Sequence, residues 1–86
     1  MIFTRRDIEL GEKARSVVEN ETYKDAFVTV RNRYIESLIN TAEGDTAVRE
    51  KAYIAVRMLD EVESHLISVM DKGKLAKQHL DKLNRR

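Results

Sequence analysis

The chain has 86 residues, of which 36% are charged and 42% hydrophobic, and its formal net charge is +1. It has no cysteine, which excludes disulfides and thiolate–metal sites. The near-zero net charge provides no whole-protein field that would attract nucleic acid. A core built from so few residues seldom supplies more than about 3–5 kcal/mol, so we expect association with another chain to add stability. There is no proline and there are only three glycines, which favours an all-α fold.

The first two helices are predicted from their caps. Thr4 is a typical N-cap, and Asp7 stands where a capping box needs its carboxylate, so a helix is predicted over about 5–19. Asn20 ends this helix and caps a second one over about 21–40. Apolar residues follow 3–4 spacing along the second helix, which indicates one packed face.

The third predicted helix, over about 46–72, has the most regular pattern in the sequence. The preceding segment, 40–46, contains Gly44 and small polar residues and is predicted to be a turn. A loop this short makes the flanking helices antiparallel neighbours. The helix then carries a 4-3-4-3-4-3 apolar seam, which predicts lengthwise packing on partner helices. The seam residues are Val48, Ala52, Ala55, Leu59, Val62, Leu66 and Val69. Leu59 and Leu66 are predicted to be central core positions.

Gly73 is predicted to end the third helix in a left-handed conformation. Residues 72–86 contain six Lys or Arg residues and one acidic residue, Asp81, while residues 1–71 are net acidic. Leu75, Leu80 and Leu83 alternate with these basic residues at helical spacing. Residues 74–86 could therefore form a short fourth amphipathic helix. The predicted organisation is therefore an antiparallel helical hairpin or three-helix bundle over 1–73, with a basic C-terminal extension over 74–86.

The sequence offers no converging catalytic groups. His65 and His79 lie fourteen residues apart on either side of the predicted break at Gly73, and neither has a neighbouring ligand pattern. No glycine-rich phosphate loop or metalloprotease motif occurs. We therefore expect a protein that is not an enzyme and that uses no metal or cofactor.

Two surfaces are candidates for contact with a partner. The third helix has more apolar face than one partner helix covers, and the extension adds further leucines. The predicted interface residues are Tyr53, Val56, Ile67, Met70, Leu75 and Leu80. The basic extension is open to three interpretations: it binds nucleic acid, it binds an acidic protein groove, or it keeps the chain soluble. The residues predicted to make such contacts are Lys74, Lys77, Lys82, Arg85 and Arg86.

A spaced pattern of residues resembles small all-helical hypothetical proteins of tailed bacteriophages. It consists of Ala14-Arg15-x-Val17-Val18-x-Asn20-x-x-Tyr23-x-x-Ala26-Phe27, Tyr34-Ile35-x-x-Leu38-x-x-Thr41, Asp45-x-x-x-Arg49-Glu50-x-x-Tyr53, Leu59-Asp60-x-Val62 and Asp71-x-Gly73-x-x-Ala76. Many of those proteins have tryptophan where Leu38 or Ile39 stands here. The resemblance implies a phage origin and a role in building or filling the particle.

The function expected from these observations is that of a non-enzymatic phage structural or adaptor protein. It would associate with itself or dock on a larger assembly through its helices. The alternative is a small regulatory or nucleic-acid-associated phage protein, such as a packaging accessory or an inhibitor of a host enzyme. No segment has the roughly 18 apolar residues of a membrane span and no signal peptide is visible, so we expect the host cytoplasm or the virion as its location.

Overall fold

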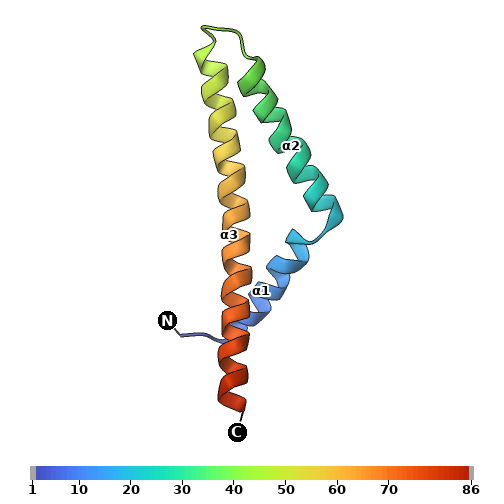
Figure 1. Cartoon of the computed structure of the whole chain (residues 1–86), viewed down its shortest axis with the longest axis vertical. Coiled ribbons are helices and arrows are strands. Elements are labelled where there is room, and N and C mark those ends of the chain that lie inside the picture. The colour runs from blue at the N-terminus through green and yellow to red at the C-terminus, as the bar shows by residue number, and fades with distance from the viewer. Residues whose placement is uncertain (1, 86) are drawn as a thin grey trace.

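A computed structural model describes residues 2–85 and shows three α-helices (Figure 1). They are α1 (Arg5–Val18), α2 (Glu21–Asn40) and α3 (Thr46–Asn84). The prediction of an all-α chain is confirmed. The molecule is elongated, with extents of 66 × 27 × 15 Å. The length comes from α3, whose 39 residues span about 58 Å at 1.5 Å per residue.

The predicted caps are confirmed at the start of both short helices. The Asp7 amide donates to the Thr4 hydroxyl, and the Thr4 amide donates to the Asp7 carboxylate at 2.8 Å. The Asn20 side chain accepts from the Tyr23 amide at 2.9 Å. Asn20 has φ −67°, so it separates α1 from α2 without a left-handed residue. The turn before α3 uses Gly44 at φ +98°, a conformation that favours glycine.

The prediction that α3 ends at Gly73 is wrong. The helix continues without a break to Asn84, and among the described residues Gly44 alone has a positive φ. The segment predicted as a separate extension is therefore the last three turns of α3. Gly73 serves packing instead, because α1 crosses α3 at this point and meets it through Gly11.

The crossing brings the two backbones almost into contact. A Cβ placed on Gly73 would lie 2.8 Å from the Gly11 Cα and 3.0 Å from the Asp7 carbonyl oxygen. A Cβ on Gly11 would lie 2.7 Å from the Gly73 Cα. Ala14 and Ala76, one turn along each helix, are buried beside the glycines. Side chains larger than these would hold the helices apart.

Leu59 and Leu66 were predicted to be central core positions, but they are not fully buried in the single chain. Both are half-buried, and within residues 2–85 the buried apolar side chains are Ala14, Ala52 and Ala76. Alanine burial removes one methyl group from water, worth about 0.8 kcal/mol. The chain by itself thus has a very small core.

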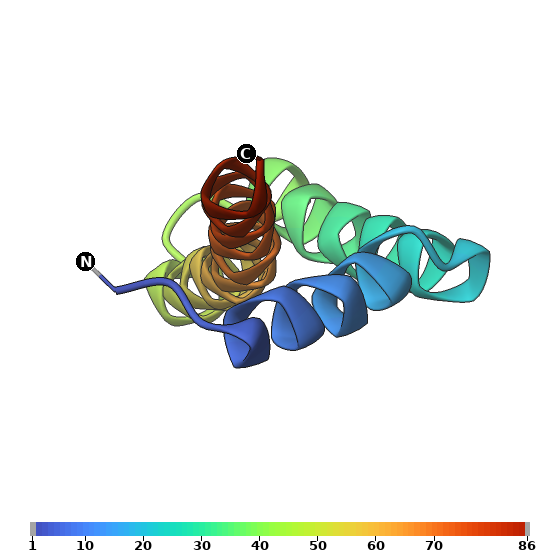
Figure 2. The ribbon, with the colours of Figure 1, turned by 90° about the horizontal axis from the view of Figure 1, so that it is seen from below.

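The helices form an open triangle (Figure 1). α1 crosses the lower half of α3 obliquely and leads away from it to a bend at Glu19 and Asn20. α2 runs from this bend back towards the upper end of α3, to which the turn at Gly44 connects it. No residue of α2, which is described over its whole length, is buried. Seen from below, α1 and α2 both lie to one side of α3 (Figure 2). In this view no other helix of residues 2–85 lies on the opposite side of α3.

We predict that Gly73→Ala destabilises the protein by about 1–3 kcal/mol, the usual range for an overpacked contact. Helix propensity alone would favour alanine over glycine by about 1 kcal/mol. A net loss of stability can therefore come only from the close contact at the crossing. Thermal unfolding followed by circular dichroism measures it. Ser68→Ala, on an exposed part of α3, is the control and should be neutral or slightly stabilising. A rise in melting temperature for Gly73→Ala would contradict the close crossing.

Candidate functional site

The predicted interface residues are only partly exposed. Tyr53, Ile67 and Leu75 are exposed, whereas Val56, Met70 and Leu80 are half-buried. Met70 lines the groove at the crossing of α1 and α3 and so packs within the chain. Five of the six, all except Leu80, lie within a sector of about 140° around α3.

Four of the predicted basic contacts are exposed on the last turns of α3, namely Lys74, Lys77, Lys82 and Arg85. Arg86 lies outside the described residues. Lys74 and Lys77 also line the crossing groove, together with Glu12 and Arg15 of α1. The basic residues are therefore carried by a rigid helix end and not by a separate tail.

The sequence interpretation missed an apolar strip on α3. Ile54, Met58 and Val62 follow one another at four-residue spacing and are 59%, 58% and 54% exposed. Val48, 44% exposed, extends the strip towards the start of α3. We call these four residues the open strip. Val48 and Val62 belong to the predicted seam, but Ile54 and Met58 lie outside it. The four-residue spacing of Ile54, Met58 and Val62 is the sequence pattern that could have predicted this strip.

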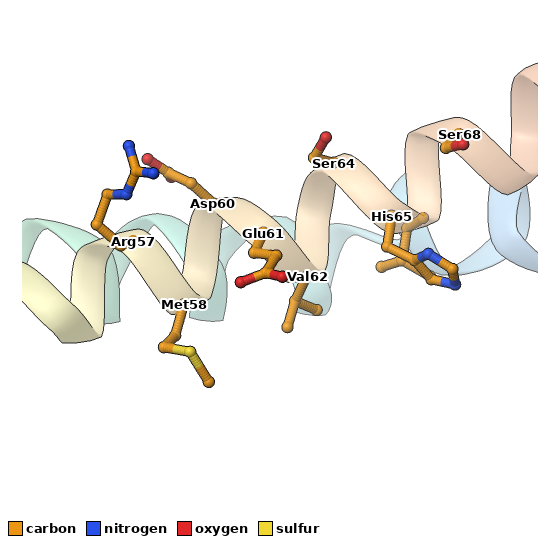
Figure 3. Close-up of a pocket in the computed structure, with 9 residues that line it drawn as sticks. Arg57, Met58, Asp60, Glu61, Val62, Ser64, His65 and Ser68 are labelled. Carbon is orange, nitrogen blue, oxygen red and sulfur yellow. The ribbon is translucent and has the colours of Figure 1, made fainter.

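Figure 3 shows the centre of this surface. Met58 and Val62 point to one side of α3, and Asp60 points to the other. A hollow of about 970 Å³ is lined here by α3 alone, with Glu61, His65 and Leu66 beside the strip. Since one helix lines it, this hollow is an open face and not an enclosed pocket.

On its other side α3 meets α2 through a bidentate ion pair. The Arg31 Nε donates to Asp60 Oδ1 at 2.8 Å, and its Nη2 donates to Oδ2 at 3.1 Å. The guanidinium lowers the pKa of the Asp60 carboxyl below its ordinary value of 3.8. Both side chains remain partly in water, at 35% and 47% exposure, so solvent screening makes this a weak surface ion pair.

A cleft of about 500 Å³ separates the α1–α2 bend from the middle of α3. Val18, Tyr23 and Phe27 form its apolar wall, and Arg31, Asp60 and Glu63 lie around it. The Tyr23 and Phe27 rings are 5.9 Å apart. The Tyr23 hydroxyl is buried without a hydrogen-bond partner. Desolvation, followed by the nearby Glu63 charge, raises the pKa of Tyr23 above its ordinary value.

The start of the chain is held against the end of α3. The Phe3 ring lies 5.7 Å from the His79 ring, and the Asp7 carboxylate lies 3.5 Å from the Lys72 Nζ. A backbone hydrogen bond at Thr4, more than Lys72, lowers the pKa of Asp7. His79 thus packs against Phe3, whereas His65 lies exposed beside the open strip.

Across residues 2–85, no three His, Cys, Asp or Glu side chains gather closely enough to hold a metal ion. In the same part of the chain, no helix combines the length and apolar character needed to cross a bilayer. No family model matches the chain, and no curated protein or solved structure was found to be similar.

We predict that Arg31→Gln returns the pKa of Asp60 towards 3.8. Because the Asp60 pKa is lowered in the folded chain, the pair stabilises above the unfolded value near 4 and is lost as pH falls through the lowered pKa. Carboxyl-carbon NMR titration measures the change, and Asp7, which does not contact Arg31, is the internal control. An Asp60 pKa that is the same in both proteins would show that the ion pair does not form.

We predict that Tyr23→Phe leaves the single chain equally stable or stabilises it by about 1 kcal/mol, because a buried hydroxyl without a partner carries a desolvation cost. Chemical denaturation at low protein concentration measures this. Tyr34→Phe, at an exposed position of the same helix, is the matched control. A loss above 1 kcal/mol for Tyr23→Phe alone would reveal a hydrogen bond to this hydroxyl.

Proposed function

We propose that this chain is a non-enzymatic structural or adaptor protein, which acts by helix-mediated association with copies of itself or with a larger assembly. The observation that carries the proposal is its exposed surface. A folded monomer of 10.0 kDa exposes about 5,200 Å² by the usual scaling with mass, whereas this chain exposes 7045 Å².

The shape supports the same conclusion. The radius of gyration is 18.3 Å, against about 12 Å for a compact domain of this length. The surface in excess of a compact monomer, roughly 1,800 Å², is more than twice the roughly 800 Å² that each partner covers in a standard interface. Subunits of obligate assemblies have such an extended form, because the partner supplies the missing core.

The open triangle indicates what a partner would supply. A helix laid on the free side of α3 would cover the open strip, and a side chain entering the Tyr23 cleft would cover Phe27. With such a partner, the compact antiparallel bundle expected from the sequence is completed between chains. The phage particle or the infected host's cytoplasm, implied by the resemblance to phage proteins, is the setting that we propose for this assembly.

The alternative is a nucleic-acid-associated or regulatory protein, and one observation favours it. Lys74, Lys77, Lys82 and Arg85 are carried together on the exposed end of α3, where phosphate contacts are sterically open. Against it, Lys74 and Lys77 share the crossing groove with Glu12. The charge that remains for phosphates is therefore small, and such binding would be strongly salt-dependent.

We predict that the purified protein is larger than one chain at high micromolar concentration. Sedimentation velocity from low to high micromolar concentration measures the mass, and a hydrophobic dye reports the uncovered apolar surface as the protein is diluted. A DNA titration at two salt concentrations is run alongside. A monomer at every concentration that also binds no dye would refute self-association, and salt-dependent DNA binding by that monomer would support the alternative.

A further inference from the structure

The open strip lies on the side of α3 that faces away from α2. Asp60, which binds Arg31 of α2, follows Met58 by two residues, or about 200° around the helix. Figure 3 shows the Met58 and Val62 side chains on the side opposite Asp60. Each of the four strip residues is at least 44% exposed, so neither α1 nor α2 covers this side of α3 along the strip.

The same side of α3 is covered further along by the start of the chain. Ala76 follows Met58 by about five full turns and is completely buried. The ring contact of Phe3 with His79 and the ion pair of Asp7 with Lys72 lie on either side of it along α3. The side of α3 on which the open strip lies is thus covered near Ala76 and left uncovered from Val48 to Val62.

We propose, building on the self-association proposed above, that the open strip binds the open strip of a second copy with the two α3 helices antiparallel. Met58 then lies next to its counterpart on the twofold axis, and Ile54 of each chain faces Val62 of the other. A twofold axis makes one surface patch sufficient for both partners.

Steric access favours the antiparallel direction. In a parallel pair, the segment from Phe3 to Asp7 of each chain would meet its counterpart at the same level and keep the helices apart. In an antiparallel pair centred on Met58, these segments lie at opposite ends. The uncovered stretches of α3 then overlap from Ile54 to Val62 of each chain.

Charge favours the same direction. A parallel pair would place the basic ends of α3, from Lys72 to Arg85, side by side, where like charges repel. In the antiparallel pair Lys72, which lies about 40° from Met58 around α3, is level with the partner's turn at Glu43 and Asp45. The Asp45 carboxylate makes no capping hydrogen bond and is available to a cation. Arg57 lies about half a turn from the level of the partner chain's Glu61.

The first test compares Met58→Glu with Leu75→Glu. Both residues are exposed on α3, at 58% and 52%, so both variants keep the fold, which circular dichroism checks. We expect Met58→Glu to weaken the dimer at least about thirtyfold, the loss typical of a central interface residue. Leu75→Glu lies outside the open strip and should leave the dimerisation constant within about twofold. Sedimentation equilibrium measures both.

The second test uses the absence of native cysteine to determine direction. Disulfides need Cα atoms within about 7 Å. In the antiparallel pair Met58→Cys forms a symmetric disulfide under mild oxidation, whereas Val62→Cys is about 12 Å from its counterpart along the axis and does not. An equimolar mixture of Ile54→Cys and Val62→Cys chains cross-links between unlike chains.

The outcomes separate this inference from the proposed function. A wild-type dimer that Leu75→Glu disrupts and Met58→Glu does not would overturn the open-strip interface and leave self-association standing. Self-cross-linking of Val62→Cys as efficient as that of Met58→Cys would overturn the antiparallel direction. A wild-type protein that stays monomeric at high micromolar concentration would overturn both self-association and this interface.

Discussion

The crossing of α1 and α3 at Gly11 and Gly73 is the contact on which the other features of the molecule depend. Neither glycine tolerates a Cβ, since each would meet backbone within 2.7–2.8 Å. The close approach fixes α1 obliquely against α3, with Phe3 and Asp7 beside His79 and Lys72. From this anchor α1 leads away from α3, so α2 must return across open space. The triangle, the Tyr23 cleft and the uncovered side of α3 all follow from that direction.

The features that the sequence predicted correctly are determined locally. The caps at Thr4 and Asn20 and the turn at Gly44 each depend on residues within a few positions along the chain. The bounds of α1 and α2 agree with prediction to within one residue. The role of Gly73 is not local. A glycine that ends a helix and one that admits a neighbouring backbone look alike in the sequence. Only the position of Gly11, sixty-two residues earlier, distinguishes them.

The seam of α3 illustrates a second limit of sequence interpretation. Its heptad spacing predicts a packing face, of which Val48 and Val62 remain exposed. Spacing does not reveal how many partner helices belong to the same chain. α2 covers the seam near Ala52, and α1 covers the opposite end of the helix. Leu59 and Leu66, between them, remain half-buried. Ile54 and Met58 lie outside the heptad pattern, and they are exposed because neither α1 nor α2 packs on α3 at their positions.

These contacts make folding and assembly interdependent. The single chain buries three alanines, and its ion pairs are partly exposed, so it is stabilised mainly by helix caps and one close crossing. A partner that binds only the folded chain adds stability in proportion to the logarithm of its free concentration. Because Met58 and Ala76 share one side of α3, a helix laid along that side would be stopped by the Phe3–Asp7 segment of an intact crossing. The crossing at Gly73 therefore stabilises the chain and also sets where the surface available to a partner ends.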